Sequence, residues 1–146
     1  DMPLDVQSLV LAELELLLAA VPAFGGLVFE DSVLRVLDAA DSELPDHFIV
    51  LQPGDTQELE RVGHGSVREQ TTINITAVTK VRAFAPALRA ARLSVKVALA
   101  GTKAGLTTEG VQKVAFQSES PLPPGPGRVW AAHVLPLQIT YVQSLK

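Results

Sequence analysis

The hydrophobic pattern of residues 5–20 is that of an amphipathic helix. Apolar side chains recur three or four positions apart, which places them on one helix face: Val6, Val10, Leu14, Leu17 and Val21. Asp5 is placed to cap the first turn, and Pro22 with the two glycines after it ends the helix. Leu9 and Leu16 point away from this face, so the helix needs a second packing partner. That partner is either further strands of the same domain or a neighbouring subunit.

Short apolar runs separated by turn residues predict strands in the next part of the chain. Residues 27–29 and 47–51 have the composition of short buried strands, and Pro53-Gly54-Asp55 is a turn signal that closes the second. Residues 32–40, between these strands, form either a helical turn or a loop.

Residues 56–81 have the pattern of a long β-hairpin whose turn is at residues 63–66. In the second arm, every other residue is predicted to face the core: Ile73, Ile75, Ala77, Thr79 and Val81. Most of the residues that alternate with them are expected to be exposed. The first arm, residues 57–62, is highly polar. We expect it to be mobile in the free subunit, with edges available for pairing to another chain.

A second helix is predicted over residues 86–100, with Pro86 in its first turn and Gly101 just past its end. Its core stripe is formed by Phe84, Leu88, Ala91, Val95 and Leu99. Arg89, Arg92 and Lys96 form a basic ridge beside that stripe.

The remaining segments predict a strand over residues 111–117, a loop rich in proline and glycine over residues 118–128, and one or two closing strands over residues 129–142. Pro136 lacks a backbone donor and therefore favours a sheet edge or a bulge. Together the elements predict one α+β domain over residues 1–146, a mostly antiparallel sheet with a long β-hairpin and two packed helices.

Composition narrows the class of protein. Apolar residues make up 47% of the chain and charged residues 19%, which excludes a disordered chain and leaves an apolar surplus that suits subunit contacts. The most apolar stretch, residues 9–24, contains Glu13 and Glu15, so we expect no membrane segment. The chain has no cysteine, which excludes disulfides, thiolate metal sites and cysteine nucleophiles.

Charge is distributed unevenly along the chain. Residues 1–60 carry 13 acidic side chains and one base, a net charge of −12, whereas residues 61–146 carry 11 bases and three acids, a net charge of +8. Two arrangements are compatible with this split. The charges pair within one domain, or an acidic face and a basic face on each subunit favour head-to-tail assembly.

No catalytic or cofactor motif is present in the sequence. The histidines, His47, His64 and His133, lack metal-site spacing, and His64 between two glycines has the position of a turn residue. There is neither a serine nucleophile motif nor a phosphate-binding loop, so we expect no enzyme, no cofactor and no metal. Nucleic-acid binding through the basic helix over residues 86–100 is an alternative, although aromatic residues make up only 5% of the chain.

Several segments follow one another in an order found in a known family. They are the leading helix, residues 20–29 (AVPAFGGLVF), Leu44-Pro45, residues 48–55 (FIVLQPGD), the polar hairpin, the alanine-rich helix and residues 137–141 (LQITY). In this arrangement the chain resembles, over nearly its whole length, the tail terminator (tail completion) proteins of long-tailed bacteriophages.

The resemblance implies a structural protein of the virion, made in the host cytoplasm and located at the tail–neck junction. Such proteins form a ring, usually hexameric, that caps the tail tube, ends its polymerisation and joins it to the head-side connector protein. DNA passes through the lumen without specific readout. Another neck or connector ring subunit is the related alternative.

Three groups of residues are candidates for contacts with other subunits or partners. They are the off-face leucines (Leu9, Leu16), the polar arm with its turn (Gln57, Glu58, Glu60, Arg61, His64) and the basic ridge (Arg89, Arg92, Lys96).

Overall fold

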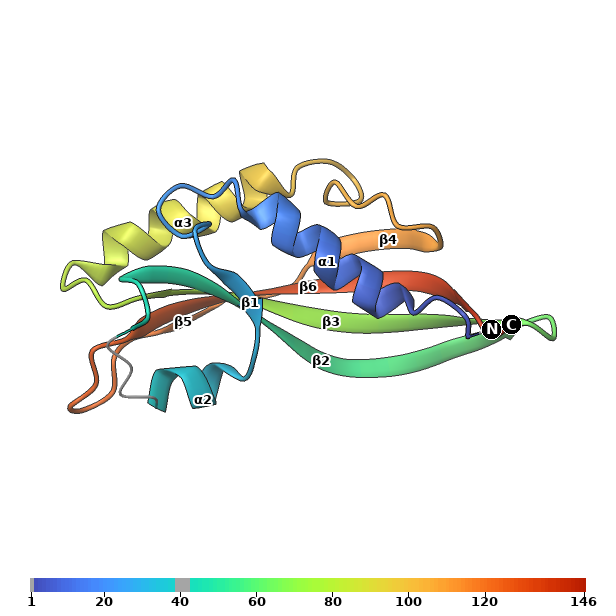
Figure 1. Ribbon diagram of the computed structural model, residues 1–146, viewed down its shortest axis with the longest axis horizontal. Coiled ribbons are helices and arrows are strands. Elements are labelled where there is room, and N and C mark those ends of the chain that lie inside the picture. The colour runs from blue at the N-terminus through green and yellow to red at the C-terminus, as the bar shows by residue number, and fades with distance from the viewer. Residues whose placement is uncertain (1, 39–42) are drawn as a thin grey trace.

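A long twisted sheet carries two helices on one face and a third on the other in the computed structural model, which describes residues 2–38 and 43–146 (Figure 1). The elements are α1 (Val6–Leu18), β1 (Val28–Glu30), α2 (Val33–Asp38), β2 (His47–Val62), β3 (Ser66–Thr79), α3 (Phe84–Ala98), β4 (Val111–Phe116), β5 (Ser120–Leu122) and β6 (Ala131–Ser144). The strand order is β1-β2-β3-β6-β4, with β5 also paired to β6. Only β1 and β2 run parallel among the described strands, which confirms the α+β class and the mostly antiparallel sheet.

The first helix begins where the sequence predicts. The Asp5 carboxylate accepts hydrogen bonds from the Gln7 backbone N–H at 3.3 Å and the Ser8 hydroxyl at 2.7 Å. The buried face is Val6, Val10, Leu14 and Leu18, so Leu18 takes the place expected for Leu17. The reason is that steps of four residues continue to the helix end, while half-buried Leu17 turns toward the loop at Gly105.

The loop after α3 is fastened to α1 by one carboxylate. Glu13 accepts hydrogen bonds from the backbone N–H groups of Thr107, at 2.9 Å, and Thr108, at 2.7 Å, and from both hydroxyls. These donors outweigh desolvation, which alone would raise the pKa of Glu13, so that its pKa is lowered. One side of α1 is therefore occupied by residues 107–108.

The predicted turn at Pro53-Gly54-Asp55 is wrong, because β2 runs through it as one 16-residue strand. Pro53 lies opposite Ile73 and Thr56 opposite Thr71, so that two residues of β2 face Thr72 alone. This is a β-bulge, which admits a proline and a glycine without ending the strand. Here the proline and glycine mark a bulge and not a chain reversal.

Apolar side chains are buried on both faces of the sheet. The larger core lies between the sheet and helices α1 and α3, and it includes Ile73, Ile75 and Ala77 of the expected set. A second core on the opposite face joins Val33 and Val36 of α2 to strand and loop residues: Phe48, Val50, Val78, Trp130 and Ala132.

The second core corrects the expectation that most hairpin residues alternating with the core-facing set are exposed. Thr76 and Val78 are buried, because α2 covers this end of the other sheet face. Val81 lies past the end of β3 and is not part of the core. The segment predicted as a helical turn or loop contains α2, and its last two residues, 39–40, lie outside the described residues.

The C-terminal strand corrects the expectations for Pro136 and for the predicted loop. β6 lies between β3 and β4, with Pro136 opposite Asn74. The Pro136 carbonyl accepts a hydrogen bond from the Gln117 N–H at 2.9 Å, so the missing donor also faces the gap between β4 and β5. No bond to β3 is lost. Residues 120–122, expected to be loop, form β5 against β6.

Two leucines of α1 provide a matched test of this packing. Leu14 is fully buried and Leu16 is 78% exposed. We expect Leu14→Ala to lower the free energy of unfolding by about 3 kcal/mol, because it leaves a cavity. Leu16→Ala should lower it by about 0.5 kcal/mol at most. Urea unfolding of the two variants measures the difference, and equal losses would contradict the helix orientation.

Candidate functional site

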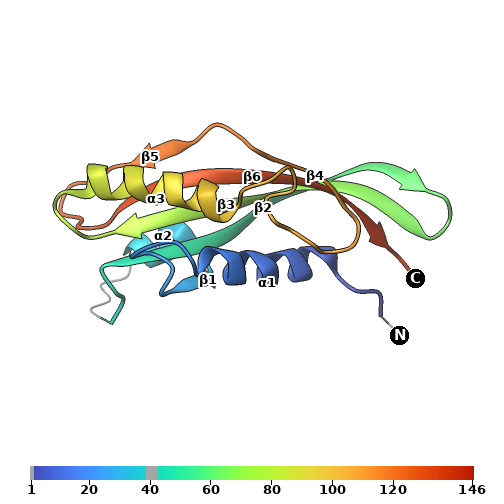
Figure 2. The same ribbon diagram turned by 90° about the horizontal axis from the view of Figure 1, so that it is seen from above.

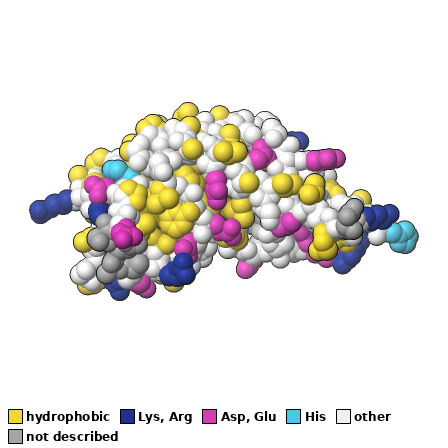
Figure 3. Space-filling view, in the orientation of Figure 1, with side chains coloured by type: hydrophobic (Ala, Val, Ile, Leu, Met, Phe, Trp, Pro, Cys, Tyr) yellow, Lys and Arg dark blue, Asp and Glu magenta, His cyan; other side chains and the backbone are white. Residues whose placement is uncertain are grey.

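The outer face of α1 is an apolar ridge. Leu16 is 78% exposed and Leu9 is 41% exposed, so neither leucine is buried by strands of the same subunit. Exposed residues Ala12, Glu15 and Ala19 lie beside Leu16 and, with Gly25 and Val28, line a shallow hollow. We call Ala12, Glu15, Leu16 and Ala19 the α1 ridge. Apolar and acidic side chains are interspersed on this face of the molecule (Figure 3).

A groove lies between α3 and β5. In Figure 2 these two elements run along the long side of the molecule opposite α1. The volume of the groove is about 300 Å³. Its lining is mainly apolar, with Arg89 and His133 as the polar members: Phe84, Ala85, Leu88, Arg89, Pro121, Leu122, Pro123, Ala132 and His133. We call it the α3–β5 groove.

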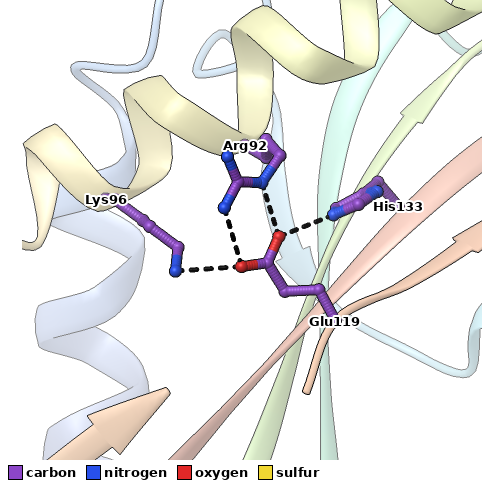
Figure 4. A network of polar contacts seen from close by, with 4 residues as sticks. All are labelled: Arg92, Lys96, Glu119 and His133. Atoms are coloured by element: carbon purple, nitrogen blue, oxygen red, sulfur yellow. Dashed lines mark hydrogen bonds and ion pairs between the residues drawn. The ribbon is translucent and has the colours of Figure 1, made fainter. Parts of the chain in front are cut away.

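One carboxylate joins the elements that form this groove (Figure 4). Glu119, directly before β5, accepts two hydrogen bonds from Arg92 of α3, at 2.6 and 2.9 Å. Lys96 of α3 lies 2.9 Å from the same carboxylate, and His133 Nε2 of β6 lies 2.8 Å from it. The Glu119 network therefore connects the helix wall of the groove to the strands on its other side.

The charge of Glu119 is stabilised by this setting. The Arg92 guanidinium holds the pKa of Glu119 well below its ordinary value of 4.5, although partial burial opposes the shift. The hydrogen bonds from His133 and Lys96 act in the same direction as Arg92. Glu119 is consequently ionised across the neutral pH range.

The network corrects the prediction of a free basic ridge. Arg92 and Lys96 are internal partners of Glu119, so reversing their charges would disturb the subunit itself as well as any contact between subunits. Arg89 alone of the three has no ion-pair partner within the described residues. The spacing of Arg92 and Lys96 places both on one helix side, but no spacing in the sequence marks Glu119, 27 residues away, as their partner.

The polar arm is exposed as the sequence predicts. Gln57, Glu58, Glu60 and Arg61 lie on β2 where it extends beyond the helices, and His64 lies in the turn (Figure 1). The arm pairs with β3 along its length, and its charges are balanced within the hairpin, because Arg61 pairs with Glu58 at 2.5 Å and Arg68 with Glu60 at 2.8 Å. The arm's contact with a partner stays a prediction.

Part of the charge imbalance between the two halves of the chain is cancelled inside the subunit. Four ion pairs join an acid of residues 1–60 to a base of residues 61–146: Glu58–Arg61, Glu60–Arg68, Asp46–Lys80 and Asp38–Arg128. Exposed pairs of this kind contribute about 0–1 kcal/mol each. Both arrangements considered for the charges therefore remain compatible with the fold, since Glu15 and Arg89 lie outside these pairs.

The described residues contain no group of three histidine, cysteine, aspartate or glutamate side chains placed to hold a metal ion. In the same ranges, no helix is both long enough and apolar enough to cross a membrane.

Removing the charge of Glu119 tests the network. We expect Glu119→Gln to lower the free energy of unfolding by about 2 kcal/mol at about pH 7, because Arg92 and Lys96 lose a charged acceptor. The folded pKa lies below 4.5, so the contribution is complete above that pH and is lost as the pH falls below it. Urea unfolding measures the free energy of unfolding of both chains at about pH 7 and about pH 3. The variant and the native chain should differ less at the lower pH. Glu109→Gln, at an exposed position, is the control; equal effects of the two substitutions would contradict this role.

The exposed arm gives a second test. The outer edge of the arm has no strand partner among the described residues, because β1 pairs only with residues 49–51 of β2, and the side chains of the arm are exposed. We expect the amides of residues 57–62 to exchange hydrogen much faster than those of residues 73–79 in the isolated subunit. Equal protection in a hydrogen-exchange experiment would show that the arm is not mobile.

The fold has a counterpart among solved structures. A chain described as "Virion of native gene transfer agent (GTA) particle" superimposes with a TM-score of 0.66 and 17% sequence identity, covering 95% of this chain and 97% of the other. Comparisons with protein-family models and with curated protein sequences give no match. The likeness therefore shows a shared fold across almost the full length of both chains.

Proposed function

We propose that the chain is a structural subunit of a phage-like virion, and that it forms the ring that caps the tail tube, ends its polymerisation and joins it to the head-side connector. The observation that carries the proposal is the fold shared with a gene transfer agent virion chain over 95% of this chain. The order of sequence segments resembling tail terminators supports the finer role independently of that comparison.

The surface of the subunit suits closed head-to-tail assembly. Helix α1, which carries the ridge, and the elements α3 and β5, which line the groove, run along opposite long sides of the molecule (Figure 2). Two different patches on opposite sides generate a heterologous contact, which closes into a ring when the rotation between subunits permits. A hexamer is the ring that the resemblance implies, with the tail tube and the connector on its two rims and DNA in its lumen.

A nucleic-acid-binding module is supported less well. Two of the three cations of the basic ridge are held by Glu119, so the helix presents Arg89 as its free cation among these three. A virion role without catalysis also agrees with the geometry of the groove, whose polar side chains are Arg89 and a His133 already engaged with Glu119. Another neck or connector ring subunit is the alternative that shares most of this reasoning.

Particle mass tests the ring. Native mass spectrometry and light scattering of concentrated protein should show a species several-fold heavier than the 15.5 kDa subunit. Added to polymerising tail tube protein, the same species should shorten the tubes. A strict monomer at about millimolar concentration that leaves tube length unchanged would contradict the proposed function.

Salt dependence separates the structural role from nucleic-acid binding. We expect negligible affinity for duplex DNA and an assembly that persists as salt rises. Binding to DNA that falls steeply with salt concentration, and that Arg89→Glu abolishes, would favour the nucleic-acid module instead.

A further inference from the structure

The α3–β5 groove combines apolar walls with a basic rim. Arg89 lies in its lining, and Arg82 lies in an adjacent hollow that shares Phe84 with the groove. Neither arginine has an ion-pair partner within the described residues, whereas Lys80 and Arg128 beside them are paired with Asp46 and Asp38. The rim therefore keeps two uncompensated positive charges next to an apolar hollow.

The walls of the groove are fixed before any partner arrives. Glu119, whose side chain is only 17% exposed, bonds to Arg92 on α3 and to His133 on β6, and it directly precedes β5. Three elements are thus held at a set spacing by charge-assisted hydrogen bonds. A preformed groove binds with little ordering cost.

The α1 ridge has the complementary character. Leu16 is an apolar side chain of the ridge that is 78% exposed, and Glu15 beside it is exposed with no ion-pair partner in the described chain. An apolar knob next to a free carboxylate matches an apolar groove next to a free guanidinium.

We propose that the α3–β5 groove receives Leu16 from the α1 ridge of a second copy of this chain, with Glu15 of that copy opposite Arg89. This inference rests on the proposed function, because the contact is the one that repeats around the ring. The elements that carry the ridge and the groove lie on opposite long sides, so the ridge of one copy cannot enter its own groove. The contact therefore joins successive copies head to tail. Leu16 acts as the central anchor and the charge pair fixes the register.

A small-molecule occupant fits the groove less well. Its volume of about 300 Å³ is at the lower limit of ligand pockets. Ligand sites also contain several convergent polar groups, whereas here Nε2 of His133 is taken by Glu119 and Arg89 is the remaining ionisable group of the lining.

Engineered disulfides test the contact, because the chain has no cysteine of its own. Leu16→Cys and Leu122→Cys, made in separate chains, should form a disulfide-linked mixed dimer when the two proteins are mixed under mild oxidation, because the contact brings the two Cα atoms within about 7 Å. Both substitutions in one chain should give a ladder of linked multimers. Leu34→Cys, at an equally exposed leucine of α2, should give no ladder with Leu122→Cys.

Charge reversal provides the second arm of the test. Glu15→Arg and Arg89→Glu should each weaken association about tenfold in sedimentation experiments, and the double variant should recover most of it. The thermal midpoint of each isolated variant should stay close to that of the native chain, since neither side chain has an internal ion pair in the described residues.

The outcomes distinguish failure of the ridge–groove contact from failure of the proposed ring function. A mixed dimer together with recovery in the charge-reversed double variant supports this contact. No cross-link, or a homodimer of Leu16→Cys alone, overturns it; if the native chain still forms a ring of several subunits, the proposed function survives with a different interface. A native chain that remains monomeric and does not cross-link overturns both.

Discussion

Apolar side chains on both faces of one long sheet must be covered, and this requirement accounts for the placement of the helices. Strands β2, β3 and β6 pack against α1 and α3 on one face and against α2 on the other. Ile75 is therefore buried on the first face and Val78 on the second. The three helices of the described residues do not cover the whole sheet. The hairpin therefore extends beyond them as a polar arm, and the outer face of α1 keeps apolar side chains that the subunit itself does not use.

The elements with strong local signals could be predicted from the sequence, and the long-range relations could not. The spacing of Val6, Val10 and Leu14 identified α1, and its outward leucines are exposed as a second packing surface requires. Two of the expectations that are wrong concern prolines and glycines, because such a residue can mark a turn, a strand edge or a bulge. Pro53 directly precedes a bulge in a continuous strand, and Pro136 lies in an interior strand with its missing donor facing the gap between β4 and β5. Both depend on which strands lie alongside, which a local pattern does not contain.

The candidate site illustrates the same division. Arg89, Arg92 and Lys96 were recognisable as one helix side, but their roles diverge because Glu119 lies within reach of only two of them. Because these two cations pair with Glu119, the surface has no continuous basic ridge, and the walls of the groove are held in place. The groove could not be predicted from the sequence. Pro121 and Leu122 have the local pattern of a loop, and only their pairing with β6 shows that they form a strand.

We propose that this fold acts as a repeated subunit whose ridge meets the groove of the next copy. Electron microscopy of the particle assembled at high protein concentration tests it most directly, because averaged images resolve both the closure and the helix positions. We expect a closed ring in which α1 of each subunit lies against α3 and β5 of its neighbour. Isolated monomers, or two-fold dimers joined through like surfaces, would contradict it.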